Sequence, residues 1–232
     1  MTVIATSTNV FSTVVKNEYA PEKAFCRDVL TVYDAAATFK VGAVLGKFIA
    51  SPTGTAAATV GTGNGVMGTI TMTSKASLQL GVYTLRITKA VTDAGDFELI
   101  DPQGDVVGLG HVATAFAKNG FAFTLADGST DFVEGDTIAI TVAGTEKYKL
   151  VEATATDGSQ IASAVYVADI NGNSGDVAIT ATTDTTVLAL TRGPAIVAKE
   201  ALTYGTSVSS TALKNVLYGQ LKAVGIIAET VA

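Results

Sequence analysis

The sequence that decides the fold lies between residues 157 and 229 and reads DGSQIASAVYVADI (157–170), TVLALTRGPAIVAKEAL (186–202) and LKAVGIIAE (221–229). A turn at 157–160 leads into an apolar strand at 161–168, and a polar loop at 169–176 separates this strand from the next short apolar runs. Short apolar runs bounded by glycine and polar turn residues are typical of β-strands. We therefore predict a small β-rich domain over this part of the chain.

A single helix is predicted near the C-terminus. Ser209 or Ser210 can cap it, because a serine side chain accepts a hydrogen bond from the free backbone amides of a first helical turn. Apolar residues then recur at helical spacing between 213 and 221, and Gly225 suits the C-terminal end, which we expect within 223–227. The polar face carries too few basic residues for a lipid surface, so the helix is expected to pack on the sheet.

The composition points to a mostly β protein. Hydrophobic residues make up 48% of the 232 residues, charged residues only 16% and aromatic residues 7%, and tryptophan is absent. The apolar content is therefore mostly aliphatic, and the frequent valine, isoleucine and threonine favour a pleated surface because branching at Cβ restricts χ1. The 23 glycines fall at most boundaries of the apolar runs, as expected for many tight turns.

Charge and hydropathy exclude two classes of partner. The net charge is −6 and the sequence has no cluster of Lys and Arg, so it lacks the electrostatic footprint of a nucleic-acid-binding protein. No apolar run reaches the ~18 residues that a membrane-spanning helix needs. The best candidate, residues 41–50, is short and contains Lys47. We expect no nucleic acid and no membrane among the partners.

Cysteine usage and the first residues indicate a protein made and used in a reducing cytoplasm. Cys26 is the single cysteine, so no intramolecular disulfide can form, and we interpret it as a small buried apolar residue. Residues 1–6 offer neither a basic n-region nor an apolar h-region. No signal peptide is therefore predicted.

Three earlier segments complete the pattern of the C-terminal domain. Residues 29–32 and 41–48 read as its first strands, the second of them containing VLGK (44–47), and residues 147–151 read as a strand just before the DGSQ turn. Together with the quoted stretches, these segments resemble the head decoration, or cement, proteins of tailed phages of the lambda type. Members of that family pass quickly from the VLGK strand to the DGSQ turn, whereas residues 49–146 intervene in this chain.

The interruption predicts one domain inserted in another. The decoration-type domain is expected at residues 1–51 and 144–232, and the insert at 52–143. The stretches 51–54 and 143–145 contain proline and glycine and are expected to be loop junctions, because surface loops tolerate long insertions at little entropic cost.

The insert reads as a β domain of its own. Its strands alternate between apolar and polar residues, so each has one buried face and one wet face. The residues expected on buried faces include Tyr83, Leu85, Ile87, Phe121, Phe123, Leu125, Ile138, Ile140 and Val142. About seven short strands separated by turns predict an immunoglobulin-like β-sandwich, and residues 59–142 also resemble β modules that recur in phage virion proteins.

Charge is divided unevenly between the two predicted domains. The insert holds nine acidic and four basic residues, a net charge of −5, whereas the remainder has a net charge of −1. We expect the acidic insert to stay in solvent and the nearly neutral base to be easier to bury against a partner.

Two motifs superficially suggest a bound nucleotide or calcium ion. Residues 63–68 match the dinucleotide-binding pattern G-x-G-x-x-G, but a strand pattern follows where that site needs a helix, so a glycine-rich hairpin or bulge is favoured. Residues 169–180 begin like an EF-hand loop, but Ser174 and Thr180 stand where that loop needs Gly and Glu, so a solvated turn is favoured.

No catalytic or cofactor-binding residue is predicted. His111 is the single histidine, the nucleophile-elbow pattern G-x-S-x-G is absent, and one His with one Cys is too few for a zinc site. We interpret His111 as structural. The acidic turns of the insert could hold a cation where they cluster, but they match no metal-binding motif. The chain is therefore not expected to be an enzyme, and no cofactor or metal is expected.

The first fifteen residues differ from the rest of the chain. They are uncharged and rich in Thr, Val and Ser, as expected for an N-terminal arm, within residues 1–20, that pairs with the strand edge of a partner. The resemblance implies that this arm engages the capsid shell. The residues expected to do so are Val3, Ile4, Val10, Phe11, Val14 and Val15. The alternative is an ordinary edge strand of the chain's own fold.

The resemblance implies a capsid decoration protein of the virion. Such a protein would be made in the host cytoplasm, bind the major capsid protein as a homotrimer on the outer surface of the expanded shell, and stabilise that shell. The insert would project outward, with weak host-surface or glycan contact as an open possibility. The alternative function is a carbohydrate- or host-binding module of a tail or fibre.

Overall fold

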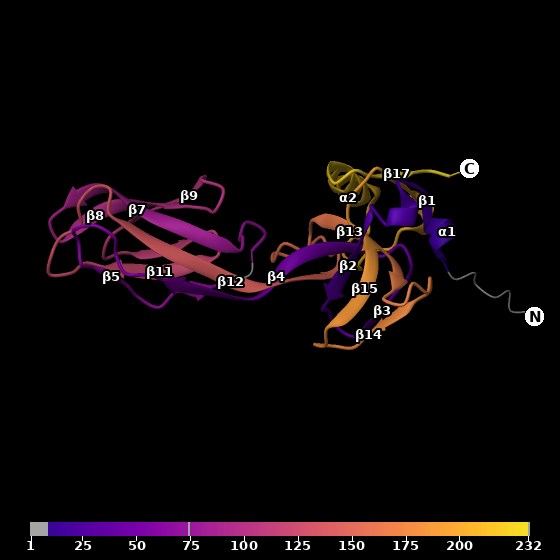
Figure 1. Ribbon diagram of the computed structural model, residues 1–232, viewed down its shortest axis with the longest axis horizontal. Helices are drawn as coiled ribbons and strands as arrows, with labels where there is room; N and C mark the ends of the chain where they lie inside the picture. Colours follow the sequence, from indigo (N-terminus) through magenta and orange to yellow (C-terminus); the bar gives the residue numbers. More distant parts are fainter. Residues whose placement is uncertain (1–8, 74, 232) are drawn as a thin grey trace, which may run out of the picture. The chain divides into compact units, whose positions relative to one another are not determined.

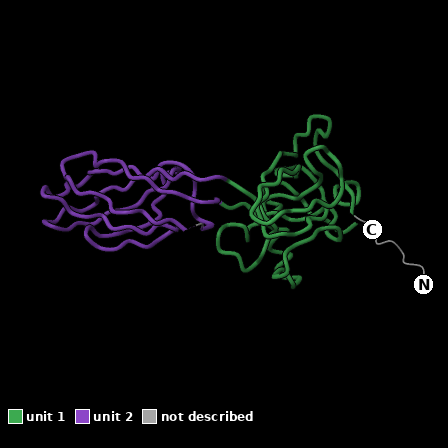
Figure 2. The backbone as a smooth tube through the Cα atoms, turned by 90° about the horizontal axis from the view of Figure 1, so that it is seen from below, with its two compact units in different colours: residues 1–48, 146–232 green, residues 49–145 purple. Residues whose placement is uncertain are grey.

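The computed structural model describes residues 9–73 and 75–231. Strands account for 48% of the chain and helices for 10%, which confirms the prediction of a mostly β fold with one C-terminal helix. The chain divides into two compact units (Figure 2): unit 1 comprises Met1–Phe48 and Glu146–Ala232, and unit 2 comprises Ile49–Thr145. Within the described residues, no helix is long and apolar enough to cross a membrane.

Unit 1 is built from three sheets and a helix (Figure 1). Its strands are β1 (Val15–Glu18), β2 (Arg27–Val32), β3 (Ala37–Phe39), β13 (Ala162–Asp169), β14 (Val177–Ile179), β15 (Thr185–Leu190), β16 (Ala195–Ala198) and β17 (Ile226–Glu229), together with parts of β4 (Val44–Ala56) and β12 (Thr137–Leu150). The largest sheet has the order β2-β15-β13-β4-β12, the second the order β1-β16-β17, and β3 pairs with β14.

Helix α2 (Thr211–Ala223) packs on unit 1 as predicted. Ser210 is the N-cap, and its hydroxyl accepts a hydrogen bond from the amide of Leu213 at 3.2 Å. Leu217 and Leu221 are buried in a core that also receives side chains from β2, β4, β13, β15 and β16. The remaining helices of the unit are short: α1 (Phe11–Val14), η1 (Pro21–Lys23) and η2 (Lys199–Ala201).

The predicted end of this helix was partly wrong. The helix stops at Ala223, and Ile226 and Ile227 belong to β17, which pairs in parallel with β16. Parallel neighbours need a crossover connection, and α2 supplies it between β16 and β17. The two isoleucines therefore complete a sheet instead of the last turn of the helix.

Unit 2 contains two sheets that share one apolar core. Its strands are β5 (Val66–Met67), β6 (Thr71–Met72), β7 (Gly81–Val91), β8 (Ala94–Ile100), β9 (Val106–His111), β10 (Ala115–Lys118) and β11 (Phe121–Ala126), with the remainders of β4 and β12. One sheet has the order β12-β7-β8-β9; in the other, β11 pairs with β10, β5 and β6. The nine residues predicted on buried faces are all buried in this core. The immunoglobulin-like assignment stays a prediction.

The stretches that mark the predicted junctions lie inside strands. Residues 51–54 are part of the continuous strand β4, and residues 143–145 are part of β12. The expectation of loop junctions was therefore wrong. The units meet along the chain at Phe48–Ile49 and Thr145–Glu146, a few residues outside the predicted insert of 52–143.

Candidate functional site

The VLGK and DGSQ motifs of unit 1 lie against each other. Gly46 of β4 pairs with Ala162 of β13, and a Cβ atom on Gly46 would lie 2.0 Å from the carbonyl oxygen of Ser159. Ser159 is completely buried. Because no side chain fits at Gly46, the VLGK strand can approach the DGSQ turn this closely only with glycine at this position.

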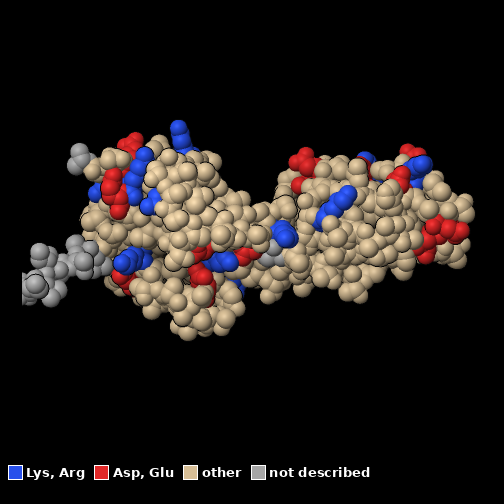
Figure 3. All heavy atoms as spheres, turned by 180° about the vertical axis from the view of Figure 1, so that it is seen from behind, with Lys and Arg blue, Asp and Glu red and all other residues tan. Residues whose placement is uncertain are grey.

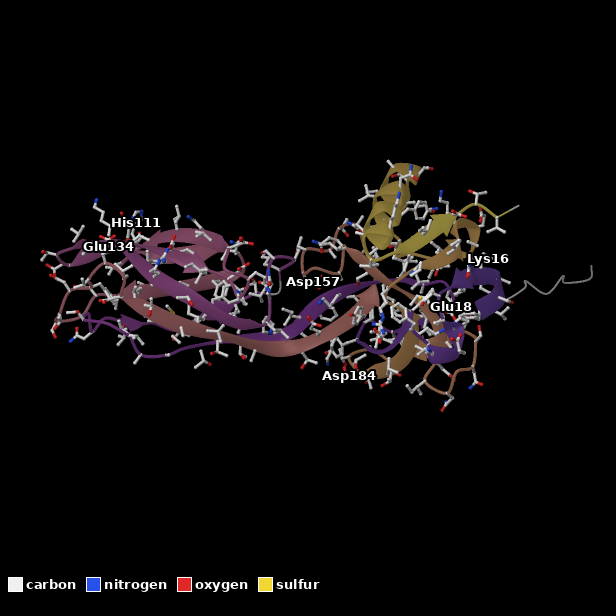
Figure 4. All side chains as sticks on the ribbon, turned by 45° about the horizontal axis from the view of Figure 1, so that its top comes forward. Lys16, Glu18, His111, Glu134, Asp157 and Asp184 are labelled. Atoms are coloured by element: carbon white, nitrogen blue, oxygen red, sulfur yellow. The ribbon has the colours of Figure 1, made fainter. Side chains whose placement is uncertain are left out.

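The DGSQ turn is held by the carboxylate of Asp157 (Figure 4). One oxygen accepts hydrogen bonds from the hydroxyl of Ser159 at 2.6 Å and its amide at 3.1 Å, and the other lies 2.7 Å from Nζ of Lys149. Burial alone would raise the pKa of Asp157, but the bonds to Lys149 and Ser159 outweigh it and lower the pKa below its usual value. The turn is therefore anchored to β12 by a charged pair.

A second close approach joins the TRGP and AVGII segments. A Cβ atom on Gly193 would lie 1.8 Å from the carbonyl oxygen of Gly225, and the amide of Gly193 donates to the carbonyl of Val224 at 2.9 Å. Immediately beyond these contacts, Ala195 of β16 aligns with Ile226 of β17. The quoted stretches thus meet in space, although about thirty residues separate them in sequence.

The end of the N-terminal segment is part of unit 1. The side-chain amide of Asn9 donates to the carbonyls of Val41 at 3.2 Å and Ala201 at 3.0 Å. The amide of Phe11 donates to the hydroxyl of Ser174. Residues 9 and 11 are therefore anchored to three segments of unit 1 that lie far apart in sequence.

The six residues predicted for the arm have different environments. Val3 and Ile4 lie outside the described residues. Val10 is 39% exposed, and Phe11 is partly buried with the Arg27 guanidinium 4.5 Å from its ring centre. The remaining two, Val14 and Val15, are buried in the core of unit 1. The expectation of an arm that extends to residue 15 or 20 is corrected here, because α1 and β1 belong to the fold.

Sequence reasoning missed Asn9 and Arg27 as anchors of this segment. Arg27 lies on β2 and binds the carboxylate of Glu18, which is labelled in Figure 4 at the end of β1, with Nε 3.0 Å from Oε2. The available signal was weak. Asn9 is the one residue with an amide side chain in the uncharged stretch 1–15. Such a side chain can donate hydrogen bonds to free backbone carbonyls.

An exposed aromatic pair lies close to this segment in unit 1. Tyr19 and Phe25 are both exposed and meet edge to face, with ring centres 5.4 Å apart. The guanidinium of Arg192 lies 5.5 Å from the Phe25 ring centre. A groove of about 310 Å³ borders Tyr19 and is lined further by residues of β1, β16 and β17, including Ile227. Tyrosine and arginine are enriched where proteins bind proteins.

The glycine-rich stretch of unit 2 is a structural loop, as the sequence favoured. The buried carboxylate of Asp136 accepts hydrogen bonds from the amides of Thr62 at 3.0 Å, Gly63 at 2.8 Å and Val133 at 2.9 Å. A Cβ atom on Gly65 would lie 2.3 Å from the Phe132 ring, so this glycine is required by close packing. Burial opposes ionisation of Asp136, but the hydrogen bonds from the three backbone amides outweigh this effect and lower the pKa of Asp136.

The Asp136→Asn variant is expected to destabilise unit 2 by about 1.5–3 kcal/mol at pH 7, because one acceptor oxygen becomes a donor that faces backbone amides. A lowered folded-state pKa means that this stabilisation is present above about pH 4 and is lost as the pH falls toward the folded value. Thermal unfolding at pH 7 and pH 3 should show a smaller pH dependence in the variant. An equal pH dependence in both proteins would contradict this role.

The other polar groups singled out in the sequence also have local partners. In the EF-hand-like loop, Asp169 accepts hydrogen bonds from the amides of Asn171 and Asn173 at 2.9 and 2.8 Å. The hydrogen bonds from Asn173 lower the pKa of Asp169. His111, labelled in Figure 4, has its Nδ1 2.5 Å from a carboxylate oxygen of Asp96 on the neighbouring strand. Asp169 and His111 thus each interact with a nearby residue of the same unit.

Acidic side chains form patches on the surface of unit 2 (Figure 3). Asp93, Asp127 and Asp131 each bring one carboxylate oxygen to within 4.8 Å of the others. The three residues lie in connections between strands, and exposed acidic groups are common without a metal ion. This cluster by itself does not define a metal site.

The family of the chain follows from comparison with known proteins. The family described as "Bacteriophage lambda head decoration protein D" matches residues 4–226, a range that includes both close glycine contacts of unit 1. The chain is therefore a structural protein of a phage head. It belongs to the lambda head decoration protein D family.

Similarity to individual proteins adds little to this assignment. No curated protein matches the sequence. Two crystal structures of Xanthomonas campestris FlgL, in space groups H3 and C2, match at 21% identity and a TM-score of 0.31 over 46% of this chain. The chain covers 34% and 33% of those proteins, about a third of their length. Similarity at this level supports no argument about function.

Proposed function

We propose that this protein binds the outer surface of the expanded phage capsid and stabilises the shell without enzymatic activity. The observation that carries the proposal is the family match over residues 4–226. A protein that binds the assembled lattice more tightly than free subunits stabilises the lattice by mass action. The partner would be the major capsid protein, and a homotrimer would place three copies of unit 1 on one local symmetry axis.

The contact surface would lie on unit 1. Its N-terminal segment is anchored at Asn9, and we propose that residues 1–8, which include Val3 and Ile4, pair with a capsid strand together with exposed Val10. The exposed pair of Tyr19 and Phe25 would add aromatic contacts. Unit 2 has a net charge of −5 and would remain in solvent on the particle.

Binding to shells and to free subunits tests the function. We expect the full chain to co-sediment with expanded shells that lack decoration protein and to bind unassembled capsid subunits at least about tenfold more weakly, because the site is made by several subunits. Tyr19→Ala with Phe25→Ala should weaken shell binding by about tenfold or more. Val133→Ala, an exposed apolar truncation on unit 2, is the matched control. Equal affinity for shells and free subunits would contradict the proposal.

The same assay locates the binding activity within the chain. Nζ of Lys47 and a carboxylate oxygen of Glu146 are 2.8 Å apart, so the ends left by removing residues 49–145 are adjacent and a short Gly/Ser linker can join them. We expect this variant to unfold cooperatively and to retain shell binding. An insoluble or molten product would show that unit 1 depends on unit 2 for its core.

A further inference from the structure

One side of strand β9 in unit 2 is paired with no other strand among the described residues, although the β10–β11 hairpin lies beside it. Strand β9 is the last strand in the order β12-β7-β8-β9 among the described residues. Strand β9 pairs with β8 (Figure 1), and just past its end the amide of Val112 donates to the carbonyl of Gly95 at 2.9 Å, which places Gly110 and Gly108 in the hydrogen-bonded positions. In antiparallel pairing, alternate residues direct their backbone groups away from the partner strand. The backbone groups of Val107 and Leu109 therefore lie on the open side of β9.

Two side chains donate hydrogen bonds to backbone carbonyl groups on this open side. Nζ of Lys118 donates to the carbonyl of Leu109 at 2.7 Å, and the side-chain amide of Asn119 donates to the carbonyl of Val107. Both donors come from the hairpin between β10 and β11. Its two loop residues, Asn119 and Gly120, have φ values of +50° and +85°, as in the tight turns that fit twisted hairpins. The turn thus holds both donors beside β9.

The rest of the β9 edge would favour association. Val106 is 52% exposed and Leu109 is 61% exposed, and residues 106–110 carry no charge. An open, uncharged and apolar edge is a template for pairing with another strand. Residues 106–110 of two copies could align antiparallel with no like charges opposite each other, so the occupant that fits this edge best is β9 of a second copy.

We infer that Lys118 and Asn119 act as an edge guard, which keeps β9 from forming a continuous sheet with β9 of a second copy. The guard satisfies two carbonyl groups that an incoming strand would need, and it places a charged ammonium group on the edge. The net charge of −5 on unit 2 adds long-range repulsion, but that repulsion acts over only ~8 Å at physiological ionic strength. The guard acts in addition at the hydrogen-bonding groups that strand pairing needs.

The test is the association state of the full chain at an ionic strength of about 0.15 M. The guard is removed by Lys118→Ala with Asn119→Gly, since glycine keeps the positive φ of the turn without strain. We expect sedimentation velocity to show a weight-average mass that rises with concentration toward about twice the wild-type value. Lys89→Ala removes the same charge elsewhere on unit 2 and should leave the mass unchanged.

A third variant shows whether association uses the β9 edge. Leu109→Lys, added to the guardless protein, restores a charge to the edge and should return the mass to the wild-type value. The inference is wrong if the protein without the guard keeps the wild-type mass. It is also wrong if that protein associates and Leu109→Lys does not reverse the association. If the double variant does not melt cooperatively, Lys118→Ala alone decides: self-association reversed by Leu109→Lys supports the guard, and the wild-type mass overturns it.

Discussion

Replacing Gly46 with alanine is expected to destabilise unit 1 by at least about 4 kcal/mol and to abolish its cooperative unfolding transition. The added Cβ would lie 2.0 Å from the Ser159 carbonyl oxygen, 2.6 Å from the carbonyl carbon and 2.7 Å from its Cα. All three are backbone atoms of a completely buried residue, so no side-chain rotation can relieve the overlap. Either β4 moves away from the DGSQ turn or the turn opens.

Two other glycines of unit 1 provide matched controls. A Cβ on Gly175 or Gly219 would meet nothing within 4 Å. Gly175→Ala should therefore be close to neutral, and Gly219→Ala should stabilise by up to about 1 kcal/mol because Gly219 lies within helix α2. Denaturant unfolding of all three variants measures the difference. A Gly46→Ala protein that unfolds at the wild-type denaturant concentration would show that the motifs are not in close contact.

These glycines also show what the sequence could and could not predict. The motif stretches identify the family, and the alternation of Tyr83, Leu85 and Ile87 predicts a buried face that the structure confirms. Neither inference requires knowing which residues, distant in the sequence, contact each other. The parallel pairing of β17 with β16 does require such a contact, because it depends on the approach of Gly193 to Gly225. The local sequence at 223–227 is compatible with either a helix or a strand.

The failed prediction of the junctions has a similar cause. Pro52, Gly54 and Gly144 are residue types that usually mark turns, yet they lie inside β4 and β12. A Cβ on Gly54 would lie 2.8 Å from Ile70, and one on Gly144 would lie 2.6 Å from Ile49. Glycine in a strand can thus mark a close neighbour instead of a chain reversal. The sequence alone does not distinguish these two uses.

The N-terminal segment was difficult to predict for the same reason. Residues 10–15 are uncharged and suited to either a strand or a flexible arm. Their burial depends on the core that surrounds Val14. It also depends on the hydrogen bonds from the preceding Asn9 to the carbonyls of Val41 and Ala201. Nothing in the segment itself reports those contacts. The boundary between arm and fold is therefore set by tertiary structure.

Two truncations are expected to separate the arm from the fold. Removing residues 1–15 eliminates α1, the Asn9 anchor and two buried valines, so it should cost several kcal/mol and lower the melting temperature sharply. Removing residues 1–8 leaves every described contact of unit 1 in place. This shorter truncation should keep the wild-type melting temperature and lose most shell binding.

Point variants assign these two effects to single side chains. Val14 is 0% exposed and belongs to the buried core of unit 1, whereas Val10 is 39% exposed. Val14→Ala should therefore destabilise the full chain by about 1–3 kcal/mol and leave shell binding of the folded protein intact. Val10→Ala should change stability by less than about 0.5 kcal/mol and weaken shell binding. If removal of residues 1–8 leaves shell binding unchanged, the capsid contact lies on the folded surface of unit 1, and the exposed Tyr19–Phe25 pair is the next surface to test.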